Sequence, residues 1–297
     1  MDILSDGAVQ SWGEGLPPWV CLDGMLRSWI AEDIGRGDVT TQALLGNNSA
    51  RPGEAVWIAK ADGVIAGLPI AERLYHLIDP TVQIVCEVCD GEFCPAGTPI
   101  ARFHGSLASL LMGERVALNT VMHLSGIATE TRAYVDLLAD LPVSLVDTRK
   151  TTPGLRVVEK YASRVAGAVN HRMGLDDAVM LKDNHIQAAG GIEPAMMRVQ
   201  RRIPYPLAIE IETETLDQVE TALLAGADII MLDNMPIALM EQAVAIVRQN
   251  VRPVKLEASG NITLETIRAV ALTGVDYIST SAPITRSPWL DISMRFC

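Results

Sequence analysis

The chain has 297 residues, of which 49% are hydrophobic, enough to bury a large core in one big domain or two ordinary ones. Its net charge of -12 disfavours a surface that follows nucleic acid or anionic lipid, so neither is expected as a partner. The sequence has no apolar run of the roughly 18 residues that a membrane helix needs and no basic start of a secretion signal, so we expect a cytoplasmic protein.

The N-terminal part of the sequence predicts a compact α+β unit. A Gly-, Pro- and Trp-rich arm over residues 1–20 precedes a helix over 22–34. Short β-like runs and one helix then follow, separated by turn residues, at 55–60, 63–67, 71–78 (the helix), 82–88 and 97–103. A long helical segment over 109–138, interrupted near Ser125 and Gly126, leads into a second domain.

The second part of the sequence predicts an α/β domain. Seven apolar runs end in polar or charged residues, at 143–150, 167–172, 178–185, 207–214, 228–234, 254–261 and 276–283. Amphipathic helical spacing lies between several of them, at 216–227, 236–250 and 263–275. Apolar strands alternating with helices are typical of a parallel sheet, and seven of them favour a closed or nearly closed barrel. We place the barrel at 128–284, after an N-terminal domain at 1–127 to which residues 285–297 return.

Cations gather at the ends of three successive runs. They are Arg149, Lys150, His171, Arg172, Lys182 and His185. In a parallel barrel every strand delivers its last residues to one face, where the active site is built, so we expect these side chains to converge. A lone cation at such a place would more simply make a surface salt bridge, and a lone histidine can equally be structural. Three cationic strand ends together predict a basic pocket for a ligand with carboxylates, which guanidinium groups bind in a bidentate manner.

The later runs end in acids and small residues. Glu210 and Glu212 share one face of a strand, and Glu210 is suited to an internal pair with one of the cations. Glu212 and Asp233 suit a divalent metal or a developing positive charge. A phosphate cradle is predicted from the small and hydroxylated residues Ser259, Gly260, Asn261, Ser279, Thr280 and Ser281. The pocket therefore suits a carboxylic acid together with a phosphorylated, metal-bound sugar.

Several motifs closely resemble the quinolinate phosphoribosyltransferase family. They are GERVALN (113–119), DTRKTTPGLR (147–156), VNHRMGLDDAVMLKDNHI (169–186), IEIETETLDQVETALLAGADIIMLDN (209–234) and LEASGNI (256–262). The resemblance runs from Gly35 to the C-terminus and implies an N-terminal α/β sandwich and an incomplete parallel α/β barrel. It also implies an obligate dimer, possibly within a higher oligomer, in which each barrel mouth is completed by the partner's N-terminal domain. The implied reaction joins quinolinate to phosphoribosyl pyrophosphate with Mg²⁺ and yields nicotinate mononucleotide, pyrophosphate and CO₂.

The same resemblance implies roles for individual residues. Quinolinate would be held by Thr148, Arg149, His171 and Arg172, with Arg115 entering from the other subunit. Lys150 and Lys182 would lie between quinolinate and the pyrophosphate and take part in catalysis. Glu212 and Asp233 would be catalytic acids near the ribose and the metal, and Ser259, Gly260 and Asn261 part of the 5'-phosphate cradle. Ser281 stands where the family usually has a glycine, and its side chain could crowd the phosphate or donate to it.

Other functions remain open from the sequence. A molybdenum-transport-associated paralogue acts on a different acid, although LKDNH at 181–185 favours the quinolinate branch. A Schiff-base lyase could instead use Lys150 or Lys182. A metabolite sensor without turnover could have the same scaffold. Three close cysteines, Cys86, Cys89 and Cys94, lack the further ligands of a zinc site and are expected to be reduced thiols.

Overall fold

The computed structural model describes residues 15–297, so most of the arm over residues 1–20 lies outside the described part. The chain forms two compact units. The first holds the described residues up to Thr129 together with Val157–Ala166 and Pro288–Cys297, and the second holds Glu130–Arg156 and Gly167–Ser287. Residues 157–166, expected in the barrel from the sequence, instead belong to the first unit.

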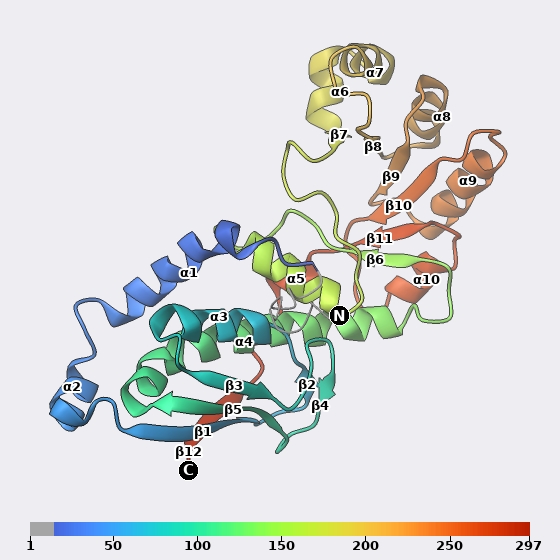
Figure 1. Cartoon of the computed structure of the whole chain (residues 1–297). Coiled ribbons are helices and arrows are strands. Elements are labelled where there is room, and N and C mark those ends of the chain that lie inside the picture. Colours follow the sequence, from blue (N-terminus) through green and yellow to red (C-terminus); the bar gives the residue numbers. More distant parts are fainter. Residues whose placement is uncertain (1–14) are drawn as a thin grey trace, which may run out of the picture. The chain divides into compact units, whose positions relative to one another are not determined.

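An antiparallel sheet with the strand order β12-β1-β5-β3 forms the centre of the first unit (Figure 1). The strands of this unit are β1 (Pro52–Ala59), β2 (Gly63–Val64), β3 (Gln83–Cys86), β4 (Phe93–Cys94), β5 (Pro99–Ser106) and β12 (Ile292–Phe296). Its helices are α1 (Trp19–Ile34), α2 (Val39–Leu45), η1 (Gly46–Asn48), α3 (Leu68–Ile78), most of α5 (Arg156–Val165) and the larger part of α4 (Leu107–Asp136). Strand β12 brings the C-terminal residues back to β1, and Trp57, Tyr75 and Phe103 pack together in the core.

Helix α4 runs unbroken from Leu107 to Asp136, so the predicted interruption near Ser125 and Gly126 is wrong. Both residues instead make close contacts with neighbouring segments of the first unit. The hydroxyl of Ser125 accepts from the backbone N–H of Ala66 at 2.9 Å and is itself fully buried. A side chain at Gly126 would clash with the carbonyl oxygen of Pro288, so glycine allows the C-terminal segment to approach the helix closely.

The second unit contains six parallel strands in the order β6-β11-β10-β9-β8-β7. These strands are β6 (Ser144–Val146), β7 (Val179–Leu181), β8 (Ile209–Thr213), β9 (Ile229–Asp233), β10 (Lys255–Ser259) and β11 (Tyr277–Ser279). The helices are α6 (Asp183–Ala189), α7 (Ile192–Gln200), α8 (Leu216–Ala225), α9 (Ile237–Arg248), α10 (Ile267–Ala271) and α11 (Ala282–Thr285). Figure 1 shows α7, α8 and α9 along one side of the curved sheet.

The barrel is incomplete, because the seventh predicted strand is reduced to one bridge. Val169 pairs with Val146 at the free edge of β6, and the described residues contain no pairing between this segment and β7. The sheet therefore stays open between Val169 and β7. The mixed α/β architecture and the incomplete parallel barrel agree with the fold class predicted from the sequence.

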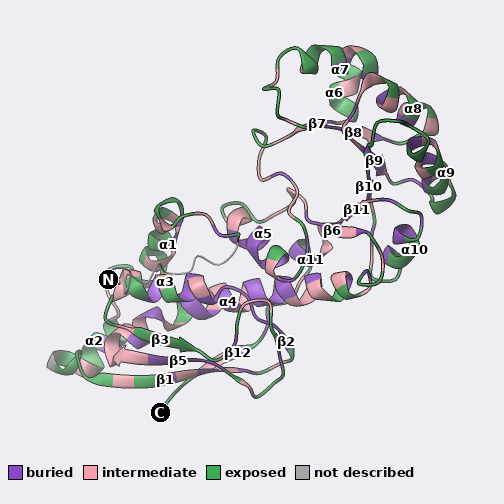
Figure 2. Ribbon diagram, turned by 45° about the vertical axis from the view of Figure 1, so that its right-hand side comes forward, coloured by how far each residue is buried: buried purple, intermediate pink, exposed green. Residues whose placement is uncertain are grey.

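The parallel registers place the strand ends in one row. Ser259 lies opposite both Asp233 and Ser279, and Ser279 lies opposite Val146. Because side chains alternate between the faces of a strand, Ile211, Ile230 and Leu256 pack in the core while their neighbours point to the other face. Figure 2 shows the buried strands in purple and the exposed outer sides of the helices in green. The sheet thus turns one face to its helices and presents the other to the candidate site.

Candidate active site

A cavity of about 710 Å³ lies at the carboxyl ends of the parallel strands. The residues predicted from the sequence that line it are Thr148, Arg149, Lys150, His171, Arg172, Lys182, Glu212, Asp233, Ser259, Gly260, Asn261, Ser279, Thr280 and Ser281. All of them belong to the second unit. Arg115 instead lies exposed on α4 in the first unit, and His185 is exposed within α6, where its Nδ1 accepts from the backbone N–H of Lys182.

Two guanidinium groups form the basic side of this cavity. Arg172 is only 9% exposed, and its Nη1 donates to the carbonyl oxygen of Ala178 at 2.8 Å. The Nε atoms of Arg149 and Arg172 are both buried without a partner, which is costly unless a ligand supplies an acceptor. Burial lowers the pKa of Arg172, and the nearby charge of Arg149 lowers it further. The pair is therefore prepared for an anion.

The loop that carries His171 and Arg172 is held by one buried acid at the end of β6. Asp147, 4% exposed, accepts from the side-chain amide of Asn170 at 2.7 Å and from the backbone N–H of His171 at 2.8 Å. Arg156 donates through Nη1 to the carbonyl oxygen of Met173 and through Nη2 to that of Arg149. The polar residues at the end of β6 thus hold the next loop in place as well as facing the cavity.

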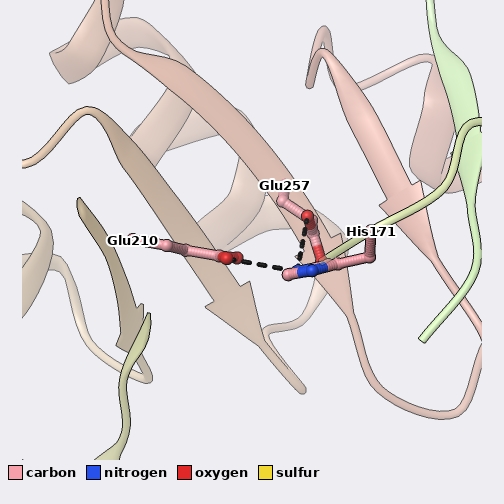
Figure 3. A group of neighbouring side chains, drawn as sticks. All are labelled: His171, Glu210 and Glu257. Atoms are coloured by element: carbon pink, nitrogen blue, oxygen red, sulfur yellow. Dashed lines mark ion pairs between the residues drawn. The ribbon is translucent and has the colours of Figure 1, made fainter. Parts of the chain in front are cut away.

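His171 lies against two buried glutamates from different strands (Figure 3). Its Nε2 is 3.1 Å from Oε2 of Glu210 on β8 and 3.9 Å from Oε2 of Glu257 on β10. The expected internal pair of Glu210 with a cationic strand end is therefore one with His171. Glu257 lines the cavity and was missed from the sequence, although a glutamate within the apolar run 254–258 was the available signal.

The charge state of Glu257 links stability to pH. Burial raises the pKa of Glu257 to about 7, and the neighbouring charge of Glu210 contributes to the rise while His171 opposes it. Because the pKa is raised in the folded state, the stability that this group contributes is complete below about pH 4.5 and is lost as the pH rises through 7.

We therefore expect Glu257→Gln, which cannot ionise, to change the melting temperature in a pH-dependent way. The melting temperature of the variant minus that of the wild type should be greater at pH 8 than at pH 5, by on the order of 3 °C. Thermal melts of the two proteins at both pH values check this expectation. A constant difference in melting temperature across this range would contradict it.

Two acids also line the cavity. Lys182 Nζ is 3.3 Å from Oε2 of Glu212, and Asp233 ends the neighbouring strand. Burial raises the pKa of Glu212, Lys182 opposes this rise, and the charge of Asp233 adds to it. The carboxylates of Glu212 and Asp233 thus act on each other electrostatically, and hard divalent cations prefer such oxygen donors. Among the described residues, however, the group of three possible metal ligands within 4.8 Å of one another is His171, Glu210 and Glu257.

A tight turn after β10 forms the third side of the cavity. Gly260 has φ +99°, and a Cβ there would clash with the side chain of Asn234. Asn234 and Asn261 also have positive φ values, of 53° and 51°, and Asn261 Nδ2 donates to Asn234 Oδ1 at 3.1 Å. Asn234 donates in turn to Asp233 at 2.9 Å, so the turn is connected to the acid. Ser281 has φ -93°, a conformation open to any residue, so its backbone does not require the glycine usual in the resembled family.

Comparison with known proteins identifies both parts of the chain. Residues 127–295 match the model of the quinolinate phosphoribosyl transferase C-terminal domain, and residues 38–125 match that of the N-terminal domain. A protein of Synechocystis sp., described as a probable nicotinate-nucleotide pyrophosphorylase [carboxylating], is 57% identical over 94% of both chains. A protein of Bacillus subtilis with the same description is 44% identical over 92% of both chains.

Solved structures give the same result. NadC from Streptococcus pyogenes superposes with a TM-score of 0.89 at 39% identity, covering 94% of this chain and 97% of its own. The nicotinate-nucleotide pyrophosphorylase from Francisella tularensis has a TM-score of 0.89 at 35% identity, covering 97% of this chain and 100% of its own. The similarity therefore extends over both units, and the range matched by the C-terminal domain model, 127–295, contains all the residues that line the cavity.

Proposed function

Since the chain belongs to the quinolinate phosphoribosyltransferase family, we propose that it transfers the phosphoribosyl group of phosphoribosyl pyrophosphate to quinolinate with decarboxylation. The products are nicotinate mononucleotide, pyrophosphate and CO₂, a step in NAD biosynthesis. One observation carries the proposal: a single cavity combines unpartnered guanidinium nitrogens, a pair of acids and a hydroxyl-rich turn. These three groups suit the carboxylates, the ribose and the phosphate of the two substrates.

The chemistry divides among the sides of the cavity. Arg149 and Arg172 hold the carboxylates of quinolinate, with Thr148 and His171 beside them, so that the ring nitrogen faces the anomeric carbon. Pyrophosphate leaves with the electrons of its bond to that carbon, and the ring nitrogen forms the new bond. The positively charged ring then accepts the electrons of the bond to the departing carboxylate, and a proton takes its place.

Charge compensation is the second task. Glu212 and Asp233 stabilise the positive charge that develops on the ribose, while Lys150 and Lys182 neutralise the pyrophosphate. The 5'-phosphate is held by the turn after β10 and the end of β11, which provide Ser259, Gly260, Asn261, Ser279, Thr280 and Ser281. The hydroxyl of Ser281 serves there as an additional donor.

We propose Mg²⁺ as the cofactor, held by Glu212 and Asp233. Their carboxylates line the cavity and interact electrostatically with each other. Carboxylate oxygens are the ligands that a hard cation prefers. When bound, Mg²⁺ would supply positive charge to the pyrophosphate group.

An assay of product formation tests the proposed function. Nicotinate mononucleotide should form from quinolinate and phosphoribosyl pyrophosphate, and chelation of Mg²⁺ should abolish the reaction. Nicotinate serves as the control acid, because it lacks the second carboxylate. Binding of quinolinate without turnover would indicate a sensor, and borohydride trapping of substrate on Lys150 or Lys182 would indicate a Schiff-base lyase.

We also propose a homodimer in which Arg115 enters the partner's site. Its side chain is 60% exposed, and its recorded ion pair, with Glu114, is a long one at 3.9 Å. If the sites are shared, mixing Arg115→Ala chains with Arg149→Ala chains should restore activity, because one of the two sites in a mixed dimer has both arginines. Mixtures that are no more active than the separate variants would contradict the shared site. Light scattering measures the mass of the particle in solution and so tests for the dimer.

We propose a cytoplasmic location on the basis of the cysteines. All five are free thiols, as expected in a reducing compartment. Separately, none of the described helices has the length and hydropathy needed to cross a bilayer. Immunodetection after cell fractionation checks the location.

A further inference from the structure

We propose that Glu257 is a positioning residue: together with Glu210 it fixes the imidazole of His171, and through this ring it keeps Arg172 in place to bind the ligand's carboxylate. This inference rests on the proposed function, because it assigns a role on the quinolinate side of the same cavity. Glu257 does not need to touch the substrate for this role.

The contacts connect two strands, β8 and β10, through His171 to the backbone of Arg172. Oε2 of Glu257 on β10 and Oε2 of Glu210 on β8 lie 3.9 Å and 3.1 Å from Nε2 of His171 (Figure 3). The other ring nitrogen, Nδ1, accepts from the backbone N–H of Arg172 at 2.7 Å. Both ring nitrogens are thus engaged, and the ring connects two strands of the barrel to the backbone of Arg172.

The hydrogen bonds also determine the form of the imidazole. Because Nδ1 accepts a hydrogen bond, its lone pair is in use, and a ring proton belongs on Nε2, between the two carboxylates. The glutamates therefore select one tautomer and one ring orientation. The wrong tautomer would present a proton from Nδ1 to the N–H of Arg172 and would break this support.

Arg172 needs such support before the ligand arrives. Its charge and that of Arg149 repel each other, and burial disfavours the charged guanidinium. Glu210 opposes both effects by its negative charge. The carboxylate of Glu210 thereby helps to keep the two like charges together at the cavity, so less ordering is required when a ligand binds.

The two glutamates are built into the barrel rather than loosely placed. Each is 3% exposed, Oε1 of each is buried without a hydrogen-bond partner, and the ion pair of each with the ring is formed by Oε2. The same arrangement of one nitrogen and two carboxylates could in principle hold a metal. The hydrogen bond that Nδ1 accepts and the 3.1 Å ion-pair distance from Nε2 to Glu210 favour a ring held directly by these protein groups, and metal binding becomes an outcome of the test.

A double-mutant cycle of Glu257→Ala and His171→Ala tests the proposal, with steady-state kinetics in both substrates and calorimetric binding of quinolinate. Glu257→Ala should raise KM for quinolinate about 10-fold, because the ring of His171 loses a neighbouring buried carboxylate that restricts it, and change kcat less than about threefold. The KM for phosphoribosyl pyrophosphate should stay the same. Glu257→Gln, which keeps the shape and an acceptor oxygen, should recover most of the quinolinate affinity.

The cycle separates an indirect role from a structural one. If Glu257 acts through His171, the double variant should match His171→Ala within about twofold, because interacting residues are not additive. Additive effects, an unchanged KM in Glu257→Ala, or a parallel loss of kcat and both affinities would overturn the proposal. The matched control is Glu241→Ala, an exposed glutamate on α9, which should behave as the wild type.

Metal binding and an inactive wild type are two further outcomes that would overturn the proposal. Stoichiometric binding of Zn²⁺ or Mn²⁺ by the wild type that disappears in Glu257→Ala would replace positioning by a metal site. A wild type that neither binds quinolinate nor forms the mononucleotide would overturn the proposed function and this inference together. An active wild type with an additive cycle would overturn the inference alone.

Discussion

Arg149→Ala is expected to raise KM and Kd for quinolinate by about 100-fold, because truncating one partner of a desolvated charge pair costs about 2–5 kcal/mol. The structural reason is that Nε of Arg149 is buried and has no hydrogen-bond partner within the protein. This N–H group is therefore available to donate to the ligand, and the variant lacks it. The fold should survive, because the backbone carbonyl that accepts from Arg156 is retained in the variant. Quinolinate titration by calorimetry, with a thermal melt for folding, measures both effects.

Arg149→Lys is the matched control for this prediction. It keeps the charge but loses the planar fork that binds a carboxylate with two hydrogen bonds. Its affinity for quinolinate should lie between those of the wild type and Arg149→Ala. Equal affinities for all three proteins would remove Arg149 from the binding site.

Asp233→Asn is expected to lower kcat by about 100- to 1000-fold at saturating quinolinate, the usual effect of losing one group that stabilises transition-state charge. The two side chains have the same shape, and the new amide oxygen can still accept from Asn234, so the turn after β10 should keep its geometry. Affinity for quinolinate should change little, because the role proposed for Asp233 is at the ribose and the metal and not at the quinolinate carboxylates. Steady-state rates at saturating concentrations of both substrates provide the measurement.

Asp217→Asn serves as the control, because Asp217 is exposed in the first turn of α8. It tests whether loss of any negative charge on this unit slows turnover. A normal kcat in Asp233→Asn would exclude the acid from the mechanism, whereas equal losses in both variants would point to a general electrostatic effect.

Much of the site could be predicted from the sequence because one rule of geometry connects distant motifs. Parallel strands end at the same face, so Arg149, Lys182, Asp233 and Ser259 could be grouped although up to 110 positions separate them. The strand registers place Asp233, Ser259 and Ser279 in one row, and the cavity brings all of these residues together.

The rest depended on contacts that periodicity does not contain. Glu257 was read as part of an apolar run, and its role becomes visible only through His171, which lies 86 positions earlier. The Ser125-Gly126 pair looks like a helix break, but the close approach of Pro288 requires a small residue there. The run 167–172 looks like a strand, yet only Val169 forms a bridge before the chain turns into the cationic loop. In each case a tertiary partner overrides the local preference.

The open side of the barrel leaves two sheet edges that must not recruit another chain. An unpaired edge is a template for intermolecular β-pairing, which leads to aggregation. Strand β7 is only three residues long and is followed directly by Lys182 and Asp183, while the edge of β6 is partly covered by the bridge to Val169. Short length and adjacent charge are means by which natural proteins protect such edges, and β7 has both, which disfavours aggregation through edge-to-edge strand pairing.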